Sequence, residues 1–271
     1  MYKVTECKNP KYFLSWGKGL QSTCLGVMAT QGLIKKPDAI ITSETGWEHP
    51  HTYVAQEYYK KYFEDNNIPV YIVQEGDIKK SIGLERITLP LWNNNTGAPL
   101  QRRCTFFYKI KPLRKKAREL CGLRLDNKGR TLKNTIILYL GISYDEAERM
   151  RDSDRNYIKN EYPLIDLKWT RNDCANYLLS LNLPVPMKSA CVICPYKDTK
   201  FWEHTKLTYP EVFKEAIIFD EKIRTPPKNM VDRGYNFKLF VYKKCIPLSE
   251  ANFSTEIKEK QDICDAGYCF V

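Results

Sequence analysis

The sequence has no apolar run that approaches the roughly 18–20 uncharged residues of a membrane-spanning helix. Its first residues, MYKVTECKNPKY, also lack the apolar core of a secretory signal. We therefore expect a cytoplasmic chain with no membrane partner. Internal repeats, low-complexity tracts and linker-like segments are absent as well, so the 271 residues indicate one large domain or a domain with an appendage.

Histidine is scarce, with three residues in the chain. Two of them, His49 and His51, share the segment SETGWEHPHT, residues 43–52. A histidine pair in a loop of this kind is more often structural or exposed than bound to metal. We therefore expect a structural role for both.

Acidic residues are too few to balance the basic ones, because 43 Lys and Arg stand against 32 Asp and Glu, a net charge of +11. This excess has two explanations. Either the lysines serve solubility, or the chain binds a polyanion such as tRNA or DNA. The densest basic segment, QRRCTFFYKIKPLRKKAR at 101–118, interleaves aromatic residues with cations. That pattern suits single-stranded nucleic acid, whose bases stack while its phosphates are neutralised. It equally suits an amphipathic helix with a solvated basic face.

Strand and helix patterns alternate over the first 75 residues. Apolar strands are expected at 11–16, 38–44 and 68–74, with helices at 22–33 and 51–65. Hydroxyl residues at the start of the first helix are able to cap it. Two strand–helix–strand units in sequence predict an α/β fold with a doubly wound, mostly parallel sheet and helices on both faces.

The later chain is less regular. We expect a loop over a site at 80–100, then a basic helix at 108–122 and a strand at 133–143. An extended segment at 162–167 precedes a helix at 170–182, with Thr170 as its N-cap. The chain is expected to be helical again from 200 to about 225 and extended at 236–244. This pattern predicts a nucleotide-binding domain with a cysteine site at 1–200, and a helical or irregular C-terminal appendage with a cysteine-containing tail at 201–271.

The stretch FLSWGKGLQSTCL, residues 13–25, places a glycine loop between the first strand and the first helix. It is not a Walker loop, because no Gly-Lys-Ser/Thr follows four residues after a glycine. Backbone N–H groups at a helix N-terminus favour an anion, and Gly17 and Gly19 let the backbone approach it closely. The hydroxyls of Ser15 and Ser22 would add donors. The alternative is an ordinary glycine turn before a helix.

Ten cysteines in a large chain without a signal are more typical of metal binding or redox chemistry than of disulfides. Cys24, Cys121 and Cys174 lie in apolar helical patterns, so we expect them in the core. Cys191 and Cys194 form CVIC before Pro195, a turn that directs two sulfurs to one metal or forms a redox dithiol. Two unrelated buried cysteines remain the alternative.

Two segments carry a family resemblance. SWGKGLQST resembles the pyrophosphate-binding loop of the adenine nucleotide alpha hydrolase-like superfamily, with a spacing similar to that of the phosphoadenosine phosphosulfate (PAPS) reductase-like proteins. SETGWEHPHT is similar to the Asp-Thr-Gly segment after their second strand, with Glu44 in place of Asp. The resemblance implies an adenine nucleotide as ligand, held by Ser15, Trp16, Gly17, Lys18, Gly19, Gln21, Ser22, Thr23, Glu44, Thr45 and Gly46.

Two further segments resemble iron–sulfur adenylyl-sulfate (APS) reductases. CTFFYKIKPL, from Cys104, is similar to their paired-cysteine segment, although Thr105 replaces the second cysteine, and CVICP is similar to their later Cys-x-x-Cys. The resemblance implies a 4Fe-4S cluster on Cys104, Cys191 and Cys194, as in the cluster-dependent tRNA thiolases. A fourth ligand is expected from the tail cysteines Cys264 or Cys269, with Cys264 favoured, or from His204. Zn²⁺ is the rival metal.

The substrate segment of those reductases, Gly-x-Arg-Arg, is replaced here by GISYDEAERMR. Asp145 and Glu146 would repel a sulfate group, which favours ATP with Mg²⁺ over PAPS or APS. Lys18, Lys109 and Arg149 are the candidates to stabilise charge on the phosphates, and Glu44 completes that catalytic set.

Three functions follow as hypotheses. The first is ATP cleavage to AMP and pyrophosphate, which adenylates a nucleic acid for sulfur transfer or base modification with a separate sulfur donor. The second is sulfonucleotide reduction, with Cys269 or Cys264 as nucleophile and a thioredoxin-like reductant. The third is a non-catalytic nucleotide-binding subunit of a larger assembly. A homodimer is compatible with each of them.

Overall fold

The computed structural model describes residues 7–81, 88–123, 134–226 and 228–253. Within that part of the chain, five parallel strands form one sheet in the order β3–β2–β1–β5–β6. The strands are β1 (Lys11–Ser15), β2 (Ala39–Glu44), β3 (Val70–Gln74), β5 (Ile136–Leu140) and β6 (Ile158–Glu161). The main helices are α1 (Leu20–Thr30), α2 (Pro50–Asp65), α4 (Lys111–Leu120) and α6 (Arg171–Ser180). The predicted doubly wound α/β fold is confirmed.

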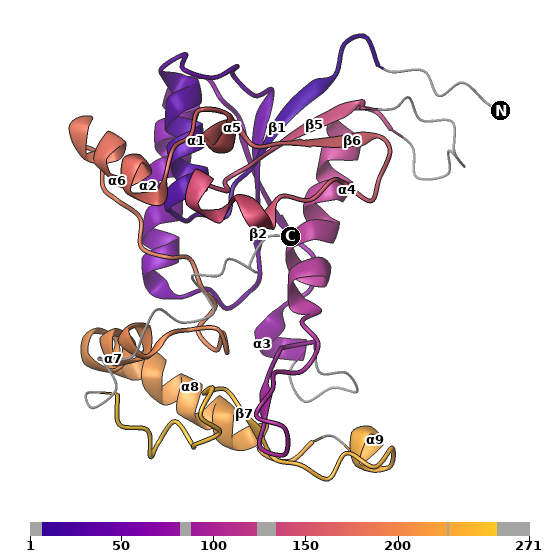
Figure 1. The fold of residues 1–271 in the computed structure, drawn as a ribbon, viewed down its shortest axis with the longest axis vertical. Coiled ribbons are helices and arrows are strands. Elements are labelled where there is room, and N and C mark those ends of the chain that lie inside the picture. The colour runs from indigo at the N-terminus through magenta and orange to yellow at the C-terminus, as the bar shows by residue number, and fades with distance from the viewer. Residues whose placement is uncertain (1–6, 82–87, 124–133, 227, 254–271) are drawn as a thin grey trace, which may run out of the picture.

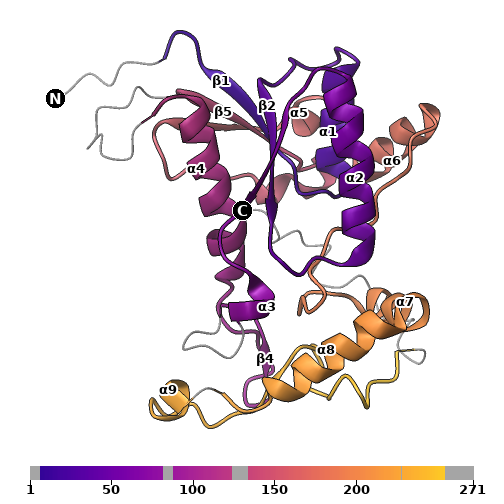
Figure 2. The same ribbon diagram turned by 180° about the vertical axis from the view of Figure 1, so that it is seen from behind.

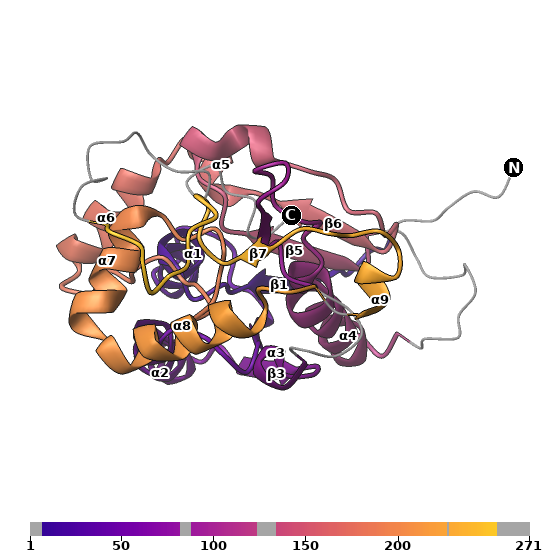
Figure 3. The ribbon, with the colours of Figure 1, turned by 90° about the horizontal axis from the view of Figure 1, so that it is seen from below.

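Alternating apolar residues on the strands bury both faces of the sheet. Leu14 and Ile40 face a core that α1, α2 and α6 cover, and their chain neighbours Phe13 and Ile41 face the other core under α4. Figures 1 and 3 show α1 and α2 on one side of β1 and α4 on the other. Because successive side chains of a strand point to opposite faces, a strand buried on both faces is apolar almost throughout.

A second hydrophobic core lies at one end of the sheet (Figures 1 and 2). It joins α7 (Thr199–Thr208), α8 (Pro210–Lys222) and the segment 239–253 to residues between 47 and 108. A two-stranded antiparallel sheet of β4 (Trp92–Asn93) and β7 (Leu239–Phe240) links the two stretches. Short helices α3 (Ile78–Ser81) and α9 (Lys228–Val231) complete this end of the molecule.

Several predicted boundaries differ from the structure. The first helix begins at Leu20 with Gly19 as its N-cap and no side-chain cap, so the predicted hydroxyl cap is wrong. The segment predicted to be extended at 162–167 holds a helical turn, α5 (Pro163–Asp166), because proline at the first helical position favours a helix start. Thr170 caps α6 in a full capping box, as predicted.

Two other elements were not predicted as they stand. The edge strand β6 has the sequence IKNE, and Ile158 is its one buried residue. Its alternation of apolar and polar residues is therefore too weak to predict a strand. The predicted basic helix begins as a π-helical turn, Phe106–Ile110, before α4. None of the helices in the described ranges is both long and apolar enough to cross a membrane.

The contact between α1 and α2 depends on Gly26. A Cβ at this position would lie 2.4 Å from Cζ of Phe63, whose side chain is completely buried. We expect Gly26→Ala to lower the free energy of unfolding by about 1–3 kcal/mol, because the ring has no space to move into. Urea denaturation measures this, and the double variant Gly26→Ala/Phe63→Leu should recover part of the loss. An unchanged midpoint for Gly26→Ala would contradict the packing described.

Candidate nucleotide site and its buried charge network

The strand order reverses between β1 and β5, the place where open α/β sheets bind ligands. Ser15 at the end of β1 pairs with Leu140 at the end of β5. The chain leaves β1 through the loop Trp16–Gly19 and enters α1. The predicted phosphate loop therefore lies at the carboxyl edge of the sheet, with the N-terminus of α1 beside it.

Internal hydrogen bonds fix the shape of this loop. The Gly17 N–H donates to Ser22 Oγ at 3.1 Å, and that hydroxyl donates to the Gly19 carbonyl at 3.3 Å. The indole N–H of Trp16 donates to Thr23 Oγ1 at 3.0 Å. Ser22, Thr23 and Trp16 thus hold the loop through their side chains, whereas the sequence alone suggested the Ser22 hydroxyl as a ligand donor.

A small pocket of about 80 Å³, which we call the phosphate pocket, lies at the N-terminus of α1. It is lined by Ser15, Gly17, Gly19, Leu20, Gln21, Ser22, Leu140, Gly141, Ile142, Glu146, Arg149, Arg171, Lys188 and Ser189. Three cations face one carboxylate among these residues. The Arg149 side chain is nine-tenths buried, and its Nε has no hydrogen-bond partner in the described part of the chain. This pocket combines a helix N-terminus, three cations and an unmatched donor, a set suited to an anion.

The two acidic residues of GISYDEAERMR do not oppose an anion as the sequence suggested. Glu146 accepts from Arg149 Nη1 at 2.6 Å and from the Gln21 amide at 3.1 Å. Burial raises the pKa of Glu146, and Arg149 acts against that shift. Asp145 accepts from the backbone N–H of Arg171 at 3.0 Å and is not among the lining residues. The expected repulsion is therefore largely cancelled.

A larger pocket of about 360 Å³, the main pocket, opens on the α4 side of the same edge. It shares Ser15, Gly17 and Leu140 with the phosphate pocket. Its other lining residues are Trp16, Lys18, Ser43, Arg102, Thr105, Phe106, Lys109, Ile110, Leu113, Arg114, Leu138, Arg151, Asp152, Asp154, Asn160 and Tyr162. Apolar side chains such as Leu113 and Leu138 share this lining with five cations and two aspartates, and its size is that of a small-molecule site.

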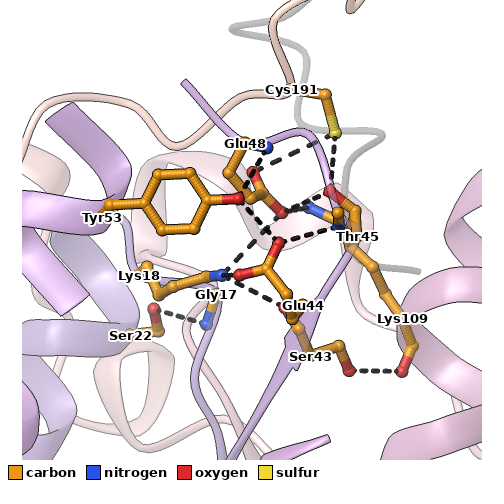
Figure 4. A network of polar contacts seen from close by, with 11 residues as sticks. Gly17, Lys18, Ser22, Ser43, Glu44, Thr45, Glu48, Tyr53, Lys109 and Cys191 are labelled. Carbon is orange, nitrogen blue, oxygen red and sulfur yellow. Dashed lines mark hydrogen bonds and ion pairs between the residues drawn. The ribbon is translucent and has the colours of Figure 1, made fainter. Parts of the chain in front are cut away.

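A network of buried charges lies beneath the two pockets (Figure 4). Lys18 adopts the left-handed backbone conformation, with φ of +65°, and its side chain is 2% exposed. Its Nζ donates to the Ser43 carbonyl at 3.1 Å and lies 3.8 Å from Glu44 and 3.9 Å from Glu48. These contacts offset the cost of a lysine in a conformation that favours glycine.

Glu48 is the centre of this network. Its carboxylate is completely buried, 3.6 Å from Lys109 Nζ, and accepts from Thr45 Oγ1 at 3.1 Å. Burial alone would raise the pKa of Glu48, but Lys109 and Lys18 hold that pKa below its usual range. Glu48 is therefore a permanent anion at neutral pH that fixes both lysines.

Glu44 was expected to bind the nucleotide, but it is not among the described residues that line the two pockets. Its carboxylate accepts from the Gly46 N–H at 2.8 Å and from the Tyr53 hydroxyl at 3.0 Å. Burial and the Glu44 charge raise the pKa of Tyr53, so the phenol stays protonated and donates. Glu44, Thr45 and Gly46 thus shape the segment after β2 through contacts within the protein.

The C-x-x-C motif forms a turn, as predicted, with the Cys194 N–H donating to the Cys191 carbonyl. Cys191 pairs with Glu48 as a β-bridge, and its Sγ lies 3.4 Å from Thr45 Oγ1 and 4.0 Å from Glu48 Oε2. Burial and the Glu48 charge raise the pKa of the Cys191 thiol. The motif therefore contacts the charge network and lines neither pocket.

The described residues do not fit a 4Fe-4S cluster or a zinc site. Across the described ranges, no three His, Cys, Asp or Glu side chains gather in a way that would hold a metal. Cys104 and Cys191 both pack against the second core, and the ring of His204 lies beside Tyr209. Cys264 and Cys269 lie outside the described residues. Cys24 and Cys174 are buried in the core under α1, as predicted, whereas Cys121 is half-buried against the core under α4.

The histidine pair is structural, as expected. His49 is completely buried, its ring 4.4 Å from that of His51 and 4.8 Å from that of Tyr209. Burial lowers the pKa of His49 from 6.5 to about 3, with Lys197, His51 and His204 acting in the same direction. The pair joins the loop before α2 to α7, because His49 Nε2 also contacts Thr205.

The structure brings Ser15, Gly17, Gly19, Gln21, Ser22 and Arg149 to the phosphate pocket, and Trp16, Lys18 and Lys109 to the main pocket. Sequence reasoning missed Arg171, Lys188 and Glu48. Arg171 follows the N-cap that was predicted correctly, so its place at a helix start beside the acidic segment was a usable signal. The sequence held no signal for Lys188 or Glu48, because contacts between distant segments place both residues at the site.

Comparison with known proteins identifies the family of the chain. The chain matches the sequence model of the phosphoadenosine phosphosulfate reductase domain over residues 11–187. Among solved structures it is similar to a phosphoadenylyl-sulfate (PAPS) reductase from Candida auris in a phosphate complex. The identity is 15% and the TM-score 0.45, over 66% of this chain and 76% of that chain. No curated protein matches.

The buried His49 makes stability depend on pH. Its folded-state pKa lies below that of the unfolded chain, so the unfolded state binds more protons between about pH 6.5 and 3. We expect the free energy of unfolding to fall as pH drops below 6.5, by up to about 1.4 kcal/mol per pH unit from this residue. Urea denaturation at a series of pH values measures the slope. An equal slope in His49→Phe would contradict this assignment.

Gly141 sets the distance between β5 and the start of α1. A Cβ there would lie 2.5 Å from the Ser22 nitrogen and 2.7 Å from its Cα, which are backbone atoms. Gly141→Ala should therefore displace the first turn of α1 and weaken ATP binding at least about tenfold, as measured by calorimetry. The matched control is Gly122→Ala after α4, a glycine that has φ of +66°, meets no atom within 4 Å and lines neither pocket, so the affinity of the folded protein should be kept. Unchanged ATP affinity in Gly141→Ala would disprove the placement.

Proposed function

Because the chain belongs to the phosphoadenosine phosphosulfate reductase domain family, we propose that it binds an adenine nucleotide across the two pockets and cleaves ATP between its α and β phosphates. The adenylyl group passes to an oxygen of a nucleic-acid acceptor, which prepares that site for modification. The observation that carries the proposal is that the two pockets are neighbours at the carboxyl edge of the sheet and share the lining residues Ser15, Gly17 and Leu140.

The two pockets suit the two halves of the nucleotide. The phosphate pocket offers the backbone N–H groups of the first turn of α1 together with Arg149 and Arg171, so the β and γ phosphates belong there. The main pocket is large enough for the nucleoside and has the apolar side chains of Leu113 and Leu138 in its wall. The α phosphorus then lies at the junction.

The reaction is an in-line displacement. An acceptor oxygen attacks the α phosphorus, the bond from that phosphorus to the α–β bridging oxygen breaks, and pyrophosphate leaves with the electron pair. Arg149 and Arg171 face the oxygens on which negative charge develops. The proton of the acceptor hydroxyl or amide passes to solvent or to the departing phosphates.

Mg²⁺ commonly assists such reactions by bridging phosphates to one or two carboxylates. Among the described lining residues of the phosphate pocket, Glu146 is the one carboxylate, and Arg149 and Gln21 already bind it. The lining of the phosphate pocket alone therefore does not fit a protein-held magnesium site, whereas Asp152 and Asp154 stand in the lining of the main pocket.

Sulfonucleotide reduction is the second candidate. The cancelled charge of Glu146 favours it, since a net cationic pocket accepts a sulfate as readily as a phosphate. Reduction needs a thiol that attacks the sulfate sulfur and expels the nucleotide, which leaves an S-sulfocysteine. A thioredoxin-like dithiol then attacks the cysteine sulfur, releases sulfite and regenerates the thiol as the dithiol is oxidised to a disulfide. No cysteine stands among the described residues that line either pocket, so this reaction requires Cys264 or Cys269.

Pyrophosphate release distinguishes the two candidates. We expect the full chain to release pyrophosphate from ATP when single-stranded RNA or DNA is added, and no sulfite from PAPS or APS with thioredoxin. Arg149→Gln should lower kcat by about a hundredfold or more, because it removes a preorganised donor to the leaving group. The exposed Lys61→Gln on α2 is the control and should retain kcat. Sulfite release without pyrophosphate release would replace the proposal with the reductase.

A further inference from the structure

Two exposed phenylalanines stand beside the main pocket. Phe106, which lines the pocket, is 43% exposed, and Phe107 is 39% exposed. Their rings contact each other edge to face, with centroids 5.4 Å apart. A single exposed apolar residue is ordinary, but a contacting pair of rings at a pocket calls for a partner. Both belong to a π-helical turn, a rare geometry that is frequent at functional sites.

Two arginines share the pocket with Phe106. Arg102 and Arg151 are among its lining residues, and Arg102 lies over the Tyr196 ring at 5.3 Å. Arg151 Nη1 donates to the carbonyls of Glu148 and Met150, and no carboxylate in the described part of the chain forms an ion pair with it. Its backbone is fixed by Tyr162, whose hydroxyl accepts from the Arg151 N–H at 3.0 Å. The guanidinium thus remains available to an anion at the pocket.

The pocket lining also includes uncharged and acidic polar residues. Thr105 lines the pocket and is 5% exposed, and its buried Oγ1 has no hydrogen-bond partner among the described residues. Asp152 and Asn160 line the pocket as well. A hydroxyl, a carboxylate and an amide are the groups that read the edges of bases.

We infer that Phe106, Phe107, Arg102 and Arg151, together called the aromatic mouth, dock a single-stranded nucleic acid whose bases stack on the rings while its phosphates meet the arginines. This inference names the acceptor class and its entry route, and so rests on the proposed function. The direction of the reaction supports it. When pyrophosphate leaves into the phosphate pocket, in-line attack brings the acceptor to the α phosphorus from the opposite side, so the acceptor enters at the mouth of the main pocket beside the nucleoside.

A single strand suits the aromatic mouth better than a duplex. Base faces are accessible in a single strand, and stacking on an aromatic ring is tolerant of sequence. In a duplex the faces are covered by neighbouring pairs, so the rings would contribute nothing. The net charge of +11 adds long-range attraction for any polyanion but does not distinguish between the two.

Fluorescence anisotropy with labelled oligonucleotides of about 12 nucleotides tests the inference on the full chain without ATP. We expect a single strand, DNA or RNA, to bind more tightly than the duplex of the same sequence. Phe106→Leu should raise Kd about tenfold, because it keeps the apolar volume and removes the stacking ring, and Phe106→Tyr should restore binding. The matched control is Tyr58→Leu on α2, an equally exposed aromatic at 45% on the opposite face of the sheet.

The salt dependence gives a second readout. Arg151→Gln should weaken binding and reduce the slope of log Kd against log salt by about 0.7, the value for one lost phosphate contact on a single strand. Lys61→Gln, 76% exposed on α2, should leave the slope unchanged. An equal Kd for Phe106→Leu and the wild type, or an equal loss in Tyr58→Leu, would overturn the inference, as would duplex binding at least as tight as that of the single strand.

The outcome is separable from that of the proposed function. Ring-dependent binding of a single strand with no pyrophosphate release would leave the aromatic mouth in place and refute adenylation. Pyrophosphate release that is stimulated by RNA or DNA but indifferent to Phe106 and Arg151 would keep the adenylation and refute this docking surface.

Discussion

The rest of the site depends on the ion pairs that the buried carboxylate of Glu48 forms with two lysines. This carboxylate lies between Lys18 and Lys109, so one anion holds a residue of the phosphate loop and a residue of the π-helical turn. A buried charge is stable only while its partners remain, because desolvation otherwise costs several kcal/mol. The strained backbone of Lys18, the end of β2 and the Cys191 turn are therefore fixed together. That arrangement gives the carboxyl edge of the sheet a defined shape before any ligand binds.

Function follows from the way that this edge is divided. On the α1 side, Gly141 lets β5 approach the first turn of the helix, and the result is a small cationic pocket. On the α4 side, the π-helical turn and the end of β6 enclose a larger, partly apolar pocket. A nucleotide that spans both would place its α phosphorus at their junction, with a leaving-group site on one side and an open route for an acceptor on the other. The cysteines of the described chain line neither pocket.

The sequence was sufficient for the parallel sheet, the loop after β1, the Thr170 cap and the C-x-x-C turn, because each depends on a local pattern or a fixed spacing. It did not reveal the contacts that side chains make within the protein. Ser22 and Glu44 have residue types suited to a ligand. In the structure Ser22 holds the loop while it also lines the phosphate pocket, and Glu44 accepts from Gly46 and lines neither pocket. Glu146 carried a charge that suggested repulsion, and Arg149 cancels it. Glu48 had no signal at all, since a glutamate in a loop is ordinarily solvated and tertiary contacts alone bury it.

The most direct measurement of the central claim is a crystal structure of the full chain with α,β-methylene-ATP, which cannot be cleaved between those phosphates. The account predicts β and γ phosphate oxygens within hydrogen-bond distance of the backbone N–H groups at Gln21 and Ser22 and of the Arg149 guanidinium, with the base in the main pocket. A triphosphate bound away from the N-terminus of α1, or one with its phosphates in the main pocket and its base elsewhere, would contradict it.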